Sequence, residues 1–176
     1  MTIRRAFIAV NLPESVKEKA FREFSPEFPK GKFKSVEREN LHFTLVFLGS
    51  TGEEKLEEIR IALRKISGFG KFGIGLGGTG SFGTRLAWMG ISDGKEKIME
   101  LHSRVCSLIG IRDGGVSAHL TIARNRGANQ EEFAEAMQRA SAKQFGEKFE
   151  VKSIELMESV LSPQGPAYSI IESFPL

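Results

Sequence analysis

A pattern of histidine, an apolar residue, threonine and an aliphatic residue occurs twice in the chain, and it constrains the fold more than any other feature. The first copy is His42–Leu45 and the second is His119–Ile122, so two of the three histidines hold equivalent places. Side chains alternate between the faces of a strand, so each histidine shares a face with the threonine two positions later. The apolar residues of the pattern then point into a core. Two such strands side by side would present two imidazoles and two hydroxyl groups to one cleft.

The segments around the two copies follow the same order, which strengthens the signal. In each half an apolar strand is followed by a helix, the histidine strand, a second helix and a strand pair. This order predicts a single domain over residues 1–176 with two pseudo-repeats. The first covers roughly 1–83, its terminal strand pair continuing into 84–91, and the second covers 84–176.

Hydrophobic periodicity gives the individual elements. The predicted helices are Glu14–Phe24, Glu53–Ile66, Lys95–Ile109 and Glu131–Ala142. The predicted strands are Ala6–Val10, Leu41–Leu48, Phe72–Gly83, Leu86–Ile91, His119–Ala123, Phe149–Leu161 and Ala167–Phe174, with a turn over Ser162–Pro166 between the last two. Residues 25–35 are expected to form a loop.

Composition limits the setting in which the chain works. A formal net charge of +3 and a pI near 9.1 suit an anionic partner, but they are too small for a protein that coats nucleic acid. The single cysteine, Cys106, excludes an internal disulfide framework and a cysteine-based zinc site. The apolar run Phe7–Val10 is far shorter than a signal-peptide core or a membrane span. We therefore expect a cytoplasmic monomer that does not contact membranes.

The two imidazoles indicate acid–base chemistry on a phosphate. With pKa values near ~6.5, one can act as a base and the other as an acid around neutral pH. In-line displacement at phosphorus needs a base on the attacking side and an acid on the leaving side. Histidines on strands from two lobes meet this requirement. The hydroxyl groups of Thr44 and Thr121 can donate hydrogen bonds to non-bridging phosphate oxygens. The mechanism needs no metal or other cofactor, and a cyclic phosphodiester is its natural substrate.

Six motifs follow one another along the chain. They are residues Arg5–Pro13, Glu39–Gly49, Gly77–Gly83, Arg85–Trp88, His119–Arg124 and Leu161–Tyr168. This set resembles the 2H phosphoesterases, and within them the RNA 2′,3′-cyclic phosphodiesterase, or 2′-5′ RNA ligase-like, family. The resemblance extends over nearly the whole chain.

This resemblance implies an α+β fold with two pseudo-symmetric lobes, each an antiparallel sheet with helices outside, and a cleft between them. It implies hydrolysis of 2′,3′-cyclic phosphates on RNA ends or nucleotides to 2′-phosphates, with 2′-5′ joining of RNA as a possible side activity. His42 and His119 would be the catalytic pair, and Thr44, Thr121 and Arg124 would bind the phosphate. Strict strand alternation, however, predicts that Arg124 points away from the histidines.

Two rival functions stay open on sequence grounds. The chain could be a non-catalytic module that binds RNA ends or nucleotides, although binding alone does not need two titrating groups. It could also be a related phosphodiesterase that acts on another small phosphodiester.

Other signals carry less functional meaning. Residues Gly78–Gly83 satisfy a G-x-G-x-x-G pattern, but a strand follows them instead of a helix, so a tight connection or close backbone packing is expected. His102 lacks the threonine and is predicted to lie on a helix surface, whereas Cys106 is predicted to be buried. Lys30, Lys32 and Lys34 fit either a guide for an RNA end or a solvated loop.

Overall fold

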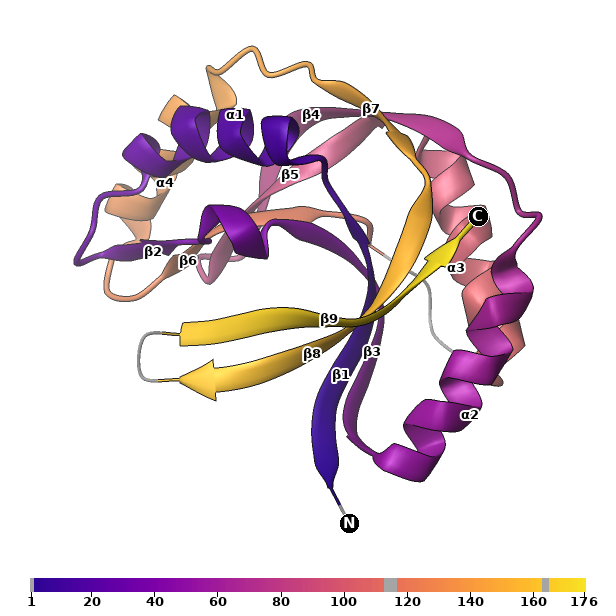
Figure 1. Cartoon of the computed structure of the whole chain (residues 1–176). Coiled ribbons are helices and arrows are strands. Elements are labelled where there is room, and N and C mark those ends of the chain that lie inside the picture. The colour runs from indigo at the N-terminus through magenta and orange to yellow at the C-terminus, as the bar shows by residue number, and fades with distance from the viewer. Residues whose placement is uncertain (1, 113–116, 163–164) are drawn as a thin grey trace.

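The computed structural model describes residues 2–112, 117–162 and 165–176. Within these residues one antiparallel sheet of nine strands has the order β7-β4-β5-β6-β3-β1-β8-β9, and β2 pairs with β6 (Figure 1). The strands are β1 (Ile3–Asn11), β2 (Phe33–Ser35), β3 (His42–Gly52), β4 (Phe72–Phe82), β5 (Leu86–Asp93), β6 (Leu120–Asn125), β7 (Lys148–Val151), β8 (Ser153–Ser162) and β9 (Gly165–Pro175). The helices are α1 (Glu14–Phe24), α2 (Glu53–Leu63), α3 (Lys95–Ile109) and α4 (Gln130–Ser141), with short 3₁₀ turns η1 (Ser25–Glu27), η2 (Arg38–Asn40) and η3 (Arg64–Ile66).

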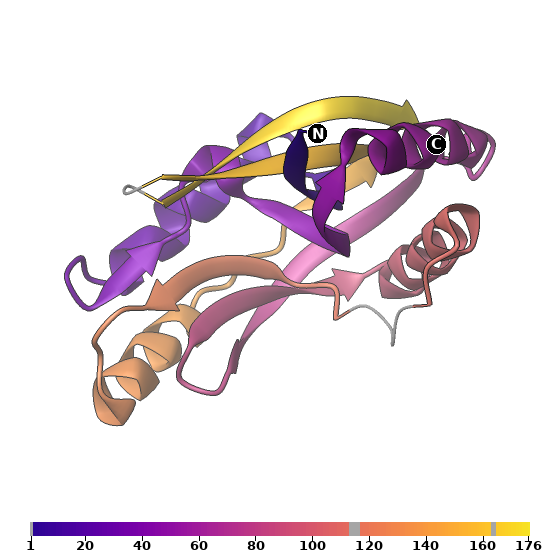
Figure 2. The same cartoon turned by 90° about the horizontal axis from the view of Figure 1, so that it is seen from below.

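The sheet has two halves that meet along the two strands carrying the repeated motif, β3 and β6, called the motif strands below. Their ladder has one paired position, Phe43 opposite Leu120. Figure 2 shows β1, β3, β8 and β9 in an upper layer and β4, β5 and β6 in a lower layer. This narrow junction brings the two copies of the motif side by side, as the sequence predicts.

The halves of the sheet do not follow the order of the chain. The strand predicted over Phe149–Leu161 is wrong in extent: it divides at Lys152 into β7 and β8, which lie in opposite halves of the sheet. β7 pairs with β4, whereas β8 pairs with β1 and forms a hairpin with β9. Apolar residues recur through the whole segment, and they carry no information about which neighbour a strand joins. The hairpin is confirmed, although positions 163 and 164 of its turn lie outside the described residues.

The four predicted helices are confirmed within a few residues at their ends. α1 and α4 lie together at one end of the molecule, and α2 and α3 at the other (Figures 1 and 2). Their apolar sides join one large core with strand residues such as Ile8, Leu45 and Ile122. On the opposite face of the sheet the described residues form one small cluster, from Phe7, Ala9 and Met157 with Tyr168 against it. One face is therefore closed by helices, and the other remains accessible.

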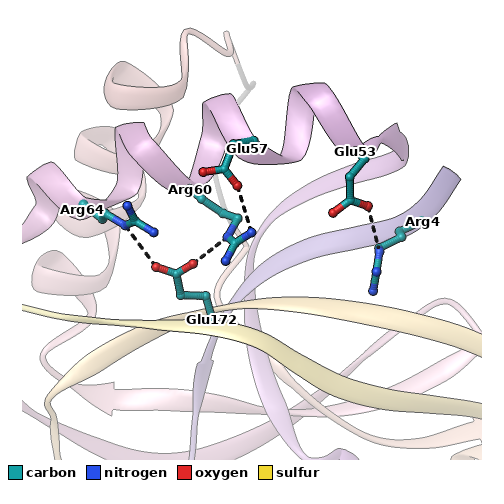
Figure 3. Close-up of polar contacts among 6 residues, drawn as sticks. All are labelled: Arg4, Glu53, Glu57, Arg60, Arg64 and Glu172. Atoms are coloured by element: carbon teal, nitrogen blue, oxygen red, sulfur yellow. Dashed lines mark hydrogen bonds and ion pairs between the residues drawn. The ribbon is translucent and has the colours of Figure 1, made fainter. Parts of the chain in front are cut away.

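Ion pairs fasten α2 to the neighbouring strands (Figure 3). Glu172 of β9 accepts hydrogen bonds from Arg60 at 2.6 Å and from Arg64 at 3.2 Å. Arg4 of β1 donates to Glu53 at the start of α2, at 3.2 Å. These side chains lie at the surface, where ion pairs stabilise a fold only weakly. They matter here because they show how most arginines outside the open face are neutralised.

Two smaller predictions have different outcomes. The glycine-rich run forms β4 and its connection to β5, as expected, and Gly80 gives the indole of Trp88 room that a Cβ would fill. The prediction of a surface His102 is wrong, because the side chain is buried and lies 3.4 Å from Cys106 Sγ. In the expected loop 25–35, the three-residue strand β2 forms because it pairs with the end of β6.

None of the helices among residues 2–112, 117–162 and 165–176 has the length and apolar character needed to cross a membrane.

Candidate active site

The accessible face of the sheet contains a cavity of about 890 Å³ between the two halves. All five residues singled out from the sequence line it. They are His42, Thr44, His119, Thr121 and Arg124. The apolar residues between them, Phe43 and Leu120, are fully buried on the helix side. Strand alternation therefore produces the predicted arrangement: the motif strands place both histidines and both threonines at one opening.

His42 is held by a hydrogen bond at each ring nitrogen. Nδ1 lies 2.7 Å from the backbone oxygen of Asn40, and Nε2 lies 3.0 Å from the hydroxyl of Thr44. A carbonyl oxygen only accepts, so Nδ1 carries a proton and the neutral ring has its lone pair on Nε2. Burial lowers the pKa of His42 to about 4, although the hydrogen bond to Asn40 acts in the opposite direction. The positive charges of Lys17 and Arg124 lower it further. His42 is thus neutral at pH 7.

His119 repeats this arrangement at a more open position. Its Nδ1 lies 2.5 Å from the backbone oxygen of Ser117, two residues earlier, as Asn40 is two residues before His42. The ring of Phe82 lies edge-on to His119 at 5.0 Å, and Tyr168 lies edge-on to His42 at 5.1 Å. In both copies a carbonyl fixes Nδ1, which leaves Nε2 as the nitrogen available for proton transfer.

A β-bulge follows the threonine in each motif strand. Between β3 and β1, Leu45 is the extra residue, and between β6 and β5 it is Ile122. A bulge places two consecutive residues on the same side of a strand, and both Ile122 and the next residue, Ala123, are buried. Arg124 is thereby returned to the cavity side. The expectation from strict alternation that Arg124 points away is wrong, because this extra residue shifts the alternation by one.

The cavity is strongly basic. Its lining includes five cations, namely Arg5, Lys34, Arg85, Arg124 and Arg126. Glu37 is the one carboxylate in the described lining, and it forms an ion pair with Lys34 at 3.0 Å. The cavity therefore suits the expected anionic partner. Its local positive charge is far stronger than the overall net charge of +3 suggests.

Several lining residues had no role in the sequence-based prediction. Phe7, Phe82 and Tyr168 pack against the histidine rings, and all three belong to motifs of the resemblance without indicating a contact. Asn40 is buried, and its side chain donates to Pro166 O at 3.0 Å and to Glu37 at 3.3 Å. It therefore connects the backbone oxygen that holds His42 to the β8–β9 hairpin. The only feature of the sequence that points to Asn40 is its position two residues before His42.

Over the described parts of the chain, no three side chains of histidine, cysteine, aspartate or glutamate gather closely enough to hold a metal ion. The donors that do converge are two imidazoles, two hydroxyl groups and guanidinium groups. This set suits proton transfer to and from a bound phosphate.

Paired histidine and threonine side chains facing one cavity on a bent antiparallel sheet define a two-histidine phosphoesterase. The model of the 2′-5′ RNA ligase superfamily matches residues 13–162 of the chain. The RNA 2′,3′-cyclic phosphodiesterase of Archaeoglobus fulgidus is 34% identical over 97% of this chain and 99% of its own length. The enzyme of the same name from Methanocaldococcus jannaschii is 33% identical over the same shares. The chain belongs to the 2′-5′ RNA ligase superfamily, and the predicted family is confirmed.

Solved structures show the same fold. Escherichia coli LigT complexed with 3′-AMP superimposes with a TM-score of 0.80 at 19% identity, covering 99% of both chains. TT0787 of Thermus thermophilus has a TM-score of 0.79 at 26% identity, covering 98% of this chain and 97% of the other. The predicted α+β fold class is confirmed.

Proposed function

We propose that the chain is an enzyme that hydrolyses 2′,3′-cyclic phosphates on RNA ends or nucleotides to 2′-phosphates. The observation that carries this proposal is the convergence of both histidine–threonine pairs on one basic cavity, with Nδ1 of each histidine held by a backbone carbonyl. Its relatives in Archaeoglobus and Methanocaldococcus, named RNA 2′,3′-cyclic phosphodiesterases, support the same activity.

The reaction assigns one proton transfer to each histidine. A water oxygen attacks phosphorus while one imidazole Nε2 takes its proton. The bond from phosphorus to the 3′ oxygen breaks as the other imidazolium gives that oxygen a proton, so the ring opens to a 2′-phosphate. Thr44 and Thr121 donate hydrogen bonds to the non-bridging oxygens, and Arg124 balances their negative charge. All chemistry is supplied by these side chains, and no metal takes part.

The partners follow from the same cavity. An RNA with a cyclic phosphate end, or a cyclic nucleotide, presents the negative charge that the arginines match. The exposed ring of Phe47 also lines the cavity and offers a surface on which a base can stack. We place the protein in the cytoplasm as a monomer. Joining of RNA ends through a 2′-5′ bond is the same displacement at phosphorus, with a 5′-hydroxyl group attacking in place of water and the 3′ oxygen leaving.

The direct test is turnover of a 2′,3′-cyclic nucleotide in the presence of EDTA. Wild type should give the 2′-phosphate, whereas His42→Ala and His119→Ala should each lose at least about 10³-fold in kcat. The matched control is His102→Asn, which alters the one histidine outside the cavity and should keep wild-type turnover once its folding is verified by circular dichroism. Loss of activity with EDTA would overturn the metal-independent mechanism. Binding of the cyclic phosphate without turnover by wild type would favour a non-catalytic module.

A further inference from the structure

Arg85 and Arg126 lie at the edge of the cavity beside Arg124. These two residues, without Arg124, are called the arginine rim. Arg126 follows the end of β6, two positions after Arg124. Arg85 lies in the connection from β4 to β5, next to Leu86, which pairs with Arg124 in the β5–β6 ladder. Both side chains are exposed and both line the cavity. The rim thus extends the phosphate site outward along one wall.

The backbone that carries the rim is fixed by Asn125. Its Nδ2 donates to Thr84 O and to Ala128 O, both at 2.9 Å. Its Oδ1 accepts from the backbone N–H groups of Gly127 at 2.9 Å and Ala128 at 2.8 Å. Its own N–H donates to Arg85 O at 2.9 Å. One side chain therefore joins the two segments that carry the rim, using both of its N–H groups and its oxygen. A site whose backbone is already ordered loses less entropy when it binds a ligand.

Neither rim arginine has an acidic partner in the described part of the chain. Several arginines outside the cavity do have such a partner: Arg60 and Arg64 share Glu172 (Figure 3), and Arg38 pairs with Glu18 at 2.9 Å. Guanidinium groups that line one cavity without a counter-charge make its potential positive, and a bound anion supplies the missing counter-charge. The rim is thus arranged to receive an anion.

The terminal cyclic phosphate does not account for this charge. It carries a single negative charge, and the two threonines and Arg124 already face it in the proposed reaction. We infer that the arginine rim is a second phosphate subsite, which binds the internucleotide phosphate on the 5′ side of the terminal nucleoside. This inference rests on the proposed function and sharpens it: the substrate is an RNA oligonucleotide, and a cyclic mononucleotide fills only part of the site.

The experiment compares two substrates that share the same terminal nucleoside cyclic phosphate: the mononucleotide and a trinucleotide. Wild type should show the higher kcat/KM with the trinucleotide. Arg85→Gln and Arg126→Gln should each lower the ratio of the two kcat/KM values by about tenfold, because only the trinucleotide has a phosphate at the rim. The slope of log(kcat/KM) against log salt concentration for the trinucleotide should weaken by about 0.7 for each arginine lost. Arg104→Gln, which removes an exposed charge on α3 outside the cavity, should leave the ratio at its wild-type value.

Equal losses on both substrates would leave the ratio unchanged, overturn the subsite and assign these arginines to the terminal phosphate. Wild-type kcat/KM values on both substrates in both variants would overturn it as well. Binding is measured in parallel, with the Kd of a trinucleotide carrying a terminal 2′-phosphate against that of the nucleoside 2′-phosphate. A preference for the trinucleotide that the rim variants abolish would support the subsite even if wild type turned over neither substrate. That result would contradict the proposed function alone.

Discussion

Phe47 and Arg124 occupy corresponding places on the two motif strands. Each follows its threonine after one bulged residue and one further buried residue, and each returns to the cavity side. The cavity side of β3 thereby carries an exposed aromatic ring, and the cavity side of β6 carries a guanidinium group. The near-symmetric histidine pairs are set in a cavity whose two sides differ in chemistry, so we expect it to bind a nucleotide in one orientation.

Arg124→Gln should lower kcat/KM for a cyclic phosphate substrate by about 10²-fold, because an interaction with developing phosphate charge is lost. Arg124→Lys should recover part of this loss, since it keeps the charge but not the paired N–H groups. Steady-state kinetics of the three proteins would check this. Wild-type kinetics in Arg124→Gln would mean that the bulge brings the side chain to the cavity without a role in binding.

The stability of the fold should depend on His42 at acidic pH. Burial holds its pKa at about 4, below the ordinary value of 6.5. Between these values the unfolded chain binds the proton and the folded protein does not, so lowering the pH favours unfolding. The stabilisation is complete above pH 6.5 and is lost as the pH falls through about 4, with a total on the order of 3 kcal/mol. Urea unfolding from pH 4 to 7 should show a flatter pH dependence in His42→Gln. The same slope in both proteins would contradict this account.

Gly80 should tolerate no side chain. A Cβ there would overlap the indole of Trp88, whose ring lies 6.4 Å from that of His119. Gly80→Ala should therefore lower the free energy of unfolding by about 1–3 kcal/mol, through overpacking. Gly73→Ala is the matched control on the same strand, because nothing lies within 4 Å of a Cβ at that position. Similar denaturant midpoints for the two variants would refute the steric argument.

The repeated motif was sufficient to predict the centre of the molecule. Periodicity of two around His42 and His119 placed both histidines and both threonines on one face, and the structure brings them to one cavity. The same reasoning failed at Arg124, because a bulge is a property of two paired strands and leaves no mark in the sequence of one. The partners of β7 and β8 were missed for a related reason. Pairing between distant strands depends on tertiary contacts, which local patterns do not contain.

His102 shows a further limit of pattern reading. It flanks the apolar stripe of α3, where the sequence favours the surface, yet the side chain is buried beside Cys106. Whether the edge of a helix stripe is covered depends on what packs against it, and here α2 lies next to α3 (Figure 1). The basic lining was underestimated likewise, because Arg5, Arg85 and Arg126 come from three separate segments.

The claim that His42 and His119 act as one unit is tested most directly by a double-mutant cycle. kcat for a 2′,3′-cyclic phosphate would be measured with EDTA for wild type, His42→Ala, His119→Ala and the double variant. Groups that transfer protons in the same step are not additive, so the double variant should lose no more than about tenfold beyond the worse single variant. Losses that multiply, or a single variant with near wild-type kcat, would contradict the paired mechanism.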